Sequence, residues 1–217
     1  MSERSPLQTW IGLALLGLPS CVAPDDNEFR GKDRSALLLS ARLRLARDPD
    51  APPPPPERFS YRSGVEFDVN YRDGDFGDPG GRADYTVWSG HIAFAPELSW
   101  HGVTLGPLAG ASFGDLTVER GTARSQESSL GGVLGVEASW RGWDYVQPYV
   151  RYSRKFAFDW SIGRFESGIE LRATPNVGFQ IAYARQTNRI DELELFGFGD
   201  SARIATEGVH LGLCWRF

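Results

Sequence analysis

Three histidines are the side chains in this sequence best suited to acid–base or nucleophilic chemistry. They stand in "HIA" (His91), "HGV" (His101) and "HLG" (His210), and none has a serine two residues further on. A Ser–His–Asp site would need Asp200 and Ser201 of "GDS" to meet a histidine from elsewhere in the chain. The simpler interpretation makes His91 and His210 hydrogen-bonded members of a polar interior. The sequence therefore predicts no catalytic residue, and a lipid-modifying enzyme stays open as an alternative.

Aspartates gather in "RDGDFGDPGGRAD", where Asp73, Asp75 and Asp78 could supply oxygen ligands to calcium. Their spacing misses the EF-hand loop, because Gly77 stands where the third ligand belongs. A solvated turn rich in aspartate and glycine is the simpler interpretation. We expect no metal site and no cofactor.

Charged side chains recur at every second position through much of the chain. The net charge is -5, and no lysine or arginine run forms a basic stripe, so nucleic acid is not expected as a partner. The charges of both signs are nearly matched along one face of the expected strands, which allows them to pair. The expected network comprises Glu66, Asp68, Glu137, Arg151, Lys155, Arg164, Glu166, Glu170, Arg172 and Arg216.

The first residues resemble an export signal. "WIGLALLGLPS" is a short apolar run that suits a signal peptide over residues 1–20. "LPSC" resembles a bacterial lipobox, which implies lipid attachment at Cys21, although Pro19 departs from the usual small residue. A plain signal peptide cut a few residues later is the alternative.

Residues 21–58 are polar and end in "DPDAPPPPPE", which predicts a stiff periplasmic linker in the polyproline II conformation. Within this stretch, "SALLLSARLRLAR" fits neither the helix period nor the strand period. It could form a short amphipathic helix or an extra strand, and residues 36–47 stay open.

From residue 59 onward, apolar side chains alternate with polar ones, which is typical of half-buried β-strands. The tight connections "WHG", "RGWD" and "ATPN" alternate with longer ones near 73–83, 119–127, 159–163 and 189–204. Eight strands with this alternation predict an all-β, antiparallel, up-and-down barrel over 59–217, with both chain ends at the side of the tight turns. The expected strands lie near 59–72, 84–100, 103–118, 128–141, 145–158, 164–173, 177–188 and 207–217.

The arrangement of the two faces decides the environment of such a barrel. Eight strands enclose a lumen barely wide enough for side chains, so the many Phe and Trp residues fit poorly inside. Placing the paired charges inside leaves the aromatic face outside, as a transmembrane barrel requires. Tryptophans near both ends of the strands, such as Trp88, Trp100 and Trp140, fit two interfacial girdles.

The chain ends in "EGVHLGLCWRF", with apolar residues at every second position up to a terminal phenylalanine. This ending resembles the last strand of bacterial outer-membrane β-barrels, which the barrel-assembly machinery recognises. The architecture is most similar to the small OmpA-like, OmpX-like and opacity-type barrels. The resemblance implies that the assembly signal comprises Leu211, Leu213, Trp215 and Phe217.

These features predict a non-enzymatic barrel in the outer membrane of a Gram-negative bacterium, with a structural or surface-binding role. Its expected partners are outer-membrane lipid, the assembly machinery and an extracellular ligand held by the outer loops. A lipid A-modifying enzyme and a narrow, porin-like channel are the alternatives.

Overall fold

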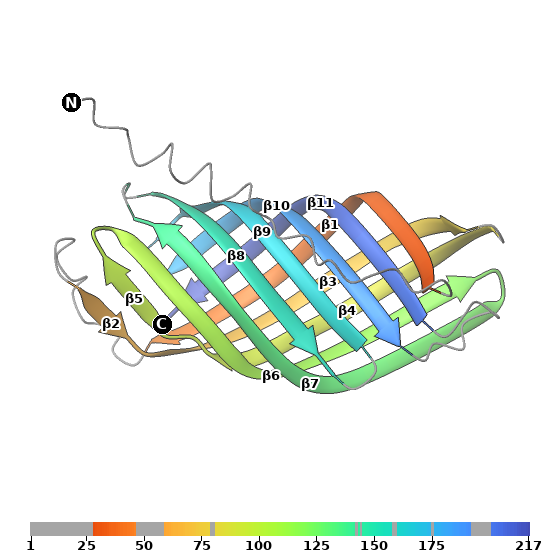
Figure 1. Cartoon of the computed structure of the whole chain (residues 1–217). Coiled ribbons are helices and arrows are strands. Elements are labelled where there is room, and N and C mark those ends of the chain that lie inside the picture. The colour runs from red at the N-terminus through yellow and green to blue at the C-terminus, as the bar shows by residue number, and fades with distance from the viewer. Residues whose placement is uncertain are drawn as a thin grey trace, which may run out of the picture.

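The computed structural model is a closed β-barrel (Figure 1). The structure describes residues 28–46, 59–78, 81–141, 143, 145–157, 160–174, 176–191 and 201–217. None of these belongs to a helix with the length and apolar character that crossing a membrane requires. The strand segments in this part of the chain are β1 (Glu28–Ala46), β2 (Ser60–Arg62), β3 (Gly64–Asp78), β4 (Gly81–Phe94), β5 (Glu97–Trp100), β6 (Val103–Arg120), β7 (Ala123–Trp140), β8 (Val146–Phe156), β9 (Trp160–Arg172), β10 (Val177–Asp191) and β11 (Ser201–Arg216).

Two pairs of these segments are each one barrel strand with a break. β2 leads into β3, and β4 leads into β5. Pro96 lies at the second break, where its missing N–H cannot serve the ladder. Across the breaks, the Ala95 N–H donates to the Gly64 carbonyl at 2.9 Å, so the two interruptions lie side by side.

The described residues thus form nine barrel strands, and the expected number of eight is wrong. Neighbours follow the chain as an antiparallel meander from β3 to β11, and β6 pairs with β7 to close the sheet. β1 fills the remaining place between β3 and β11. It runs antiparallel to β3 but parallel to β11, so the sheet is mixed rather than wholly antiparallel. An odd number of strands makes one parallel pair unavoidable.

β1 answers the question left open over residues 36–47, because the extra strand is the alternative that forms. Glu28–Ala46 lies inside the stretch 21–58 expected as a linker, and it is a full member of the wall. Because β1 starts beside Ser201 and ends beside Arg216, it enters the barrel at the end opposite to Phe217. The described part of the chain therefore begins and ends at opposite ends of the barrel, whereas eight strands would place both of its ends on one side. We call the end near Phe217 the C-terminal end and the other the distal end.

The connections also differ from those expected. The tight turn at His101 and Gly102 has positive φ at both residues, as a two-residue hairpin with type I′ geometry requires. At the distal end, β3 continues to Asp78 and β4 starts at Gly81, while β6 and β7 are separated by two residues. β9 already begins at Trp160, so three of the four expected long loops, near 73–83, 119–127 and 159–163, lie largely in ladders. Residues 192–200 of the last loop lie outside the described residues.

Candidate functional site

The outer face of the barrel carries a continuous set of exposed apolar side chains. All nine strands contribute to it, and the exposed fraction of these side chains is 37–55 %. Soluble monomers rarely expose one continuous apolar surface of this extent. We call it the apolar belt; it comprises Leu39, Leu45, Val65, Val69, Ile92, Phe94, Leu105, Leu134, Val136, Tyr152, Ile169, Leu171, Phe179, Ile181, Val209 and Leu211.

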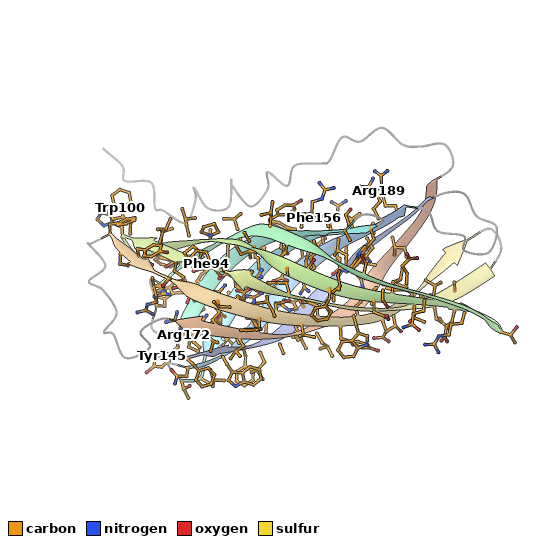
Figure 2. All side chains as sticks on the ribbon, turned by 90° about the horizontal axis from the view of Figure 1, so that it is seen from below. Phe94, Trp100, Tyr145, Phe156, Arg172 and Arg189 are labelled. Atoms are coloured by element: carbon orange, nitrogen blue, oxygen red, sulfur yellow. The ribbon has the colours of Figure 1, made fainter. Side chains whose placement is uncertain are left out.

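Aromatic side chains border the belt toward the distal end. The rings of Tyr71 and Trp88 lie 4.7 Å apart on neighbouring strands, and Phe113, on the strand next to β4, is exposed. Figure 2 shows Phe156 on this part of the barrel, well away from Trp100. We call this border the aromatic margin; it comprises Tyr71, Trp88, Phe113, Phe156, Phe165 and Tyr183.

Beyond the aromatic margin, the outer face becomes polar. Asp115 follows Phe113 on the same face, and it accepts hydrogen bonds from the Ser128 hydroxyl at 2.5 Å and the Gln126 amide at 2.8 Å. These two hydrogen bonds lower the pKa of Asp115, and the bond from Ser128 has the larger effect. Arg185 lies 3.6 Å from Glu207 on this level. We call the part of the barrel beyond the margin the distal zone.

The interior of the distal zone contains the largest apolar cluster of the described residues, with Asn188 and Arg72 buried beside it. Its cluster contains Tyr85 and Val87 of β4, Leu116 and Val118 of β6, and Trp160 of β9, all at most 8 % exposed. Gly114 makes room for the Trp160 ring, because a Cβ there would come within 1.7 Å of it. The side chains thus fill the lumen at this end. The remaining members of the cluster are Ala83, Ile162 and Ile204.

The lumen behind the belt is filled by charges instead. Glu66, fully buried on β3, accepts from Arg44 at 2.8 Å and from Arg151, and it shares a hydrogen bond of 3.1 Å with His91. Arg42 lies within 3.3–3.8 Å of four carboxylates on three strands. Removing one member of such a buried group leaves the other charges unpaired, which lowers the free energy of unfolding by several kcal/mol. The four carboxylates are Glu66, Asp68, Glu137 and Glu166.

The ten residues expected as a charge network all face inward. Glu66, Asp68, Glu137, Arg151, Lys155, Arg164 and Glu166 are buried in the middle of the lumen. Glu170 lies nearer the C-terminal end, where the Arg216 guanidinium donates to it at 2.5 and 2.6 Å. Arg172 lies 3.8 Å from the same carboxylate and also bonds Gln147. His91 and His210 are buried in the same lumen.

Two central members of this network went unrecognised in the sequence. Arg42 and Arg44 belong to β1, whose "LLL" run hides the strand period, so neither was expected inside. The alternation that follows, Arg42 and Arg44 against Leu43 and Leu45, was the available signal. Arg154 was also missed, and it points outward between Tyr152 and Phe156.

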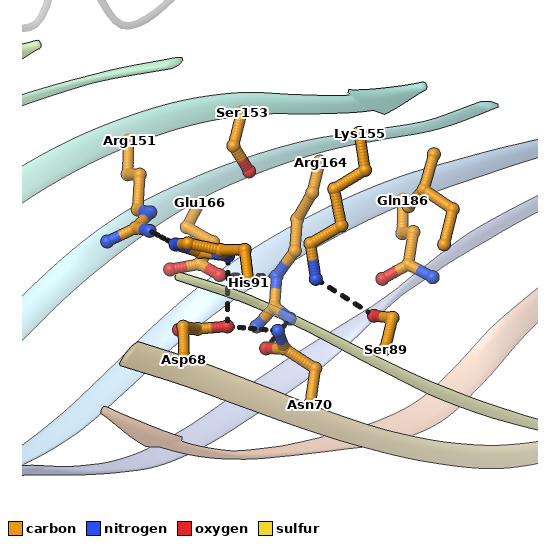
Figure 3. A pocket seen from close by; sticks show the side chains of 11 residues that line it. Asp68, Asn70, Ser89, His91, Arg151, Ser153, Lys155, Arg164, Glu166 and Gln186 are labelled. Atoms are coloured by element: carbon orange, nitrogen blue, oxygen red, sulfur yellow. Dashed lines mark hydrogen bonds and ion pairs between the residues drawn. The ribbon is translucent and has the colours of Figure 1, made fainter. Parts of the chain in front are cut away.

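Figure 3 shows the lumen side chains around a cavity of about 10 Å³, which Ile162 of the apolar cluster also lines. Lys155 reaches from β8 and donates to the Ser89 hydroxyl at 3.1 Å. Arg164 of β9 bonds the Asn70 amide oxygen, and Asn70 bonds Asp68. A cavity of this volume holds about one water. A second lumen cavity of similar volume lies beside Glu97 and Thr104. The polar lumen is therefore closely packed rather than open.

One arrangement in the lumen has the order of groups used in nucleophilic catalysis. Ser40 Oγ lies 2.7 Å from His210 Nε2, and His210 Nδ1 lies 3.7 Å from a Glu166 oxygen. A serine, a base and an orienting carboxylate in sequence can activate the hydroxyl. His210 and Glu166 are at most 2 % exposed. Ser40 was missed with β1, so the sequence could not place this group.

The four residues of the expected assembly signal lie on the outer face of β11 and at its end. Leu211 and Phe217 are exposed, and Leu213 and Trp215 are half-buried. Cys21 and residues 1–20 lie outside the described residues, as does the proline run. Cys214 is a free thiol buried inside the lumen.

In the described part of the chain, no group of three or more His, Cys, Asp or Glu side chains is placed to hold a metal ion. Asp73 and Asp75 lie on the outer face of β3 in the distal zone, and the side chain of Asp78 is outside the description. No protein-family model, curated protein or solved structure matches this chain.

Proposed function

We propose that this chain is a transmembrane barrel of a bacterial outer membrane, with a structural or surface-binding role and no enzymatic activity. The observation that carries the proposal is the apolar belt around a lumen of paired charges. In a water-soluble barrel, the opposite arrangement would be expected. Lipid around the belt removes its apolar surface from water, and the closed ladder leaves no backbone group unpaired there.

The height of the belt supports the same proposal. On β6, outward apolar residues run from Val103 to Phe113, which is ten residue steps. At about 3.4 Å per residue and a tilt of about 45°, these steps rise about 24 Å. The apolar band of an outer-membrane barrel is about 25 Å tall. The aromatic margin would then lie at one membrane interface.

The filled lumen favours a structural or binding role over a channel. Two cavities between its middle and Glu97 have volumes of about 10 Å³ each, and the apolar cluster of the distal zone fills the section toward the distal end. Contacts with a partner would then be made by the distal turns and by the polar outer face of the distal zone. By analogy with the C-terminal strand of outer-membrane barrels, we place the distal zone outside the cell.

Fractionation and gel migration test this proposal. The chain, produced in bacteria, should be extracted from membranes only by detergent. It should migrate differently on SDS gels before and after boiling, because the intact barrel resists the detergent. Single-channel recording in a planar bilayer should show no steady conductance. A monodisperse protein in detergent-free buffer would contradict the membrane location, and steady conductance would contradict the closed lumen.

A lipid-modifying hydrolase is the second candidate, and the Ser40–His210–Glu166 arrangement is what favours it. If Ser40 is an activated nucleophile, a fluorophosphonate probe should label the detergent-solubilised chain, and Ser40→Ala should abolish the labelling. Ser153→Ala is the matched control, since that serine also faces the lumen. Because the base and the carboxylate are buried, we expect no labelling. If the chain is labelled and Ser40→Ala abolishes the labelling, the proposal of a non-enzymatic barrel is wrong and the hydrolase is supported.

A further inference from the structure

The C-terminal end of the lumen carries an excess of positive charge. Four arginines, Arg62, Arg141, Arg172 and Arg216, lie at this opening beside Arg44, and Glu97 and Glu170 are the carboxylates that the described residues place among them. Arg44 is also held by Glu66 at 2.8 Å and by Glu137 at 2.7 Å, so the other four arginines and the two carboxylates give a local balance of 4 − 2 = +2. This differs from the middle of the lumen, where charges of both signs pair closely. We call the set the basic mouth; it comprises Arg44, Arg62, Arg141, Arg172 and Arg216, with Glu97 and Glu170.

Glu97 and Glu170 do not pair with all of these guanidinium groups. Glu97 already accepts from Arg44 at 3.4 Å and from Arg141 at 2.9 Å. Glu170 is held by both nitrogens of Arg216. Arg62 lies opposite Glu97 in the β2–β5 ladder, yet no ion pair joins it to any described residue. Buried Nε atoms of Arg141, Arg172 and Arg216 likewise have no hydrogen-bond acceptor in the described part of the protein.

A cavity of about 50 Å³ opens among these side chains, at the breaks between β2 and β3 and between β4 and β5. It is lined by Arg44, Arg62, Arg141, Arg216 and Glu97. One water needs only about 10–15 Å³, so this cavity has room for a group of several heavy atoms. Arginine guanidinium groups match the geometry of phosphate oxygens and can bind them in pairs. The chemistry of the lining therefore suits a phosphate group.

The same cavity is bordered by the apolar belt. Leu45 and Val65 also line it, and both are exposed on the outer face. Aromatic side chains stand at this end of the barrel, where the rings of Trp140 and Trp143 lie 5.0 Å apart. Figure 2 shows Trp100, Tyr145 and Arg172 together at this end. In the proposed membrane position, the cavity would lie at the depth of lipid headgroups, with apolar surface leading away from it.

We propose that the basic mouth binds the phosphate group of a membrane phospholipid, whose acyl chains lie along Leu45 and Val65. This inference rests on the proposed membrane location. Arg62 supplies the guanidinium that has no ion pair with any described residue, and Arg141 lines the same cavity. The ligand would balance the positive charge that the described residues leave in the mouth.

Native mass spectrometry of the full chain in detergent tests the proposal. Phosphatidylglycerol, diacylglycerol with the same acyl chains, and inorganic phosphate would be added in separate titrations. We expect one phosphatidylglycerol to remain bound, no diacylglycerol to remain, and inorganic phosphate to displace the lipid. The double variant Arg62→Gln/Arg141→Gln should weaken lipid binding by at least about tenfold, since it removes two charge-assisted hydrogen-bond donors to the phosphate.

Arg124→Gln is the matched control, because it removes the same charge from an exposed pair in the distal zone. Arg62→Gln alone breaks no ion pair, so it should keep the fold and still weaken binding. Equal retention of diacylglycerol, or unchanged binding by the double variant, would overturn the proposal. Binding of inorganic phosphate without phosphatidylglycerol would assign the site to a free anion instead. A chain that needs no detergent would refute the membrane location, while the phosphate titration would still report on the cavity.

Discussion

The belt and the distal zone are built from the same strands but with opposite faces. On β6, Leu105 points outward in the belt, whereas Leu116 points into the lumen of the distal zone. On β4, Ile92 points outward and Tyr85 inward. At the same level, the polar side chains move from the lumen to the outer face. One barrel wall therefore contains a membrane-type arrangement next to the arrangement of a soluble protein.

The face that carries the apolar side chains therefore depends on the position along the strand. The apolar residues of β6 occupy odd numbers up to Phe113, apart from Leu108, which packs inside the lumen with Ala93 and Val133, and they occupy even numbers from Leu116. On β4, the apolar side chains move from the inner to the outer face between Val87 and Trp88. On β9, they do so between Ile162 and Phe165. Because successive side chains alternate between faces, each change moves the apolar set across the wall. The changes lie near the aromatic margin on each strand, as expected if the margin marks a boundary between lipid and water.

The largest effect should come from the charge centre behind the belt. Arg42→Met removes the guanidinium that lies among four buried carboxylates, and we expect it to lower the free energy of unfolding by about 3–5 kcal/mol. Denaturant titration of the folded band on unboiled gels would measure this loss. Arg124→Gln, which breaks an exposed pair in the distal zone, should cost at most about 1 kcal/mol. Similar losses in both variants would mean that the two zones do not differ in this way.

A charge placed on the outer face should distinguish the zones next. Leu134→Arg puts a guanidinium in the middle of the belt and should destabilise the barrel in lipid bilayers by about 2–4 kcal/mol. Thr117→Arg puts the same group on the outer face of the distal zone, where a change within about 0.5 kcal/mol is expected. Folding titrations in vesicles would compare the two. Equal tolerance at both positions would refute the membrane assignment of the belt.

The interior of the distal zone should respond more locally. Leu116→Ala leaves a cavity in the apolar cluster and should cost about 2 kcal/mol, near the lower end for such truncations, because the hairpin can collapse around it. Hydrogen exchange should rise in β6 and β7 near the distal turn, while the belt stays protected. If protection falls evenly along the whole barrel, the belt and the distal zone unfold as one unit and do not differ in local stability.

Much of the belt was predictable, because alternation from Val65 to Tyr71 or from Val209 to Phe217 assigns each side chain to a face. β1 was not, since three consecutive leucines obscure its period and only pairing with β3 and β11 sets its register. The distal zone was missed for another reason. Aspartate and glycine in "RDGDFGDPGGRAD" resemble a loop, whereas the ladder between β3 and β4 continues through them. The Ser40–His210 contact joins strands far apart in sequence, which no local pattern reveals.

The parallel pair between β1 and β11 has a consequence for how the barrel forms. It joins Glu28 to Ser201 and Arg44 to Arg216, the most distant partners in the sheet, and parallel ladders are slightly weaker per residue than antiparallel ones. Bringing such distant segments together has a high entropic cost and slows folding. The hairpins from β3 onward can form beforehand, and the cylinder closes only when the last strand meets the first. A nascent chain halted before Ser201 would keep an open edge on β1, where another strand could pair.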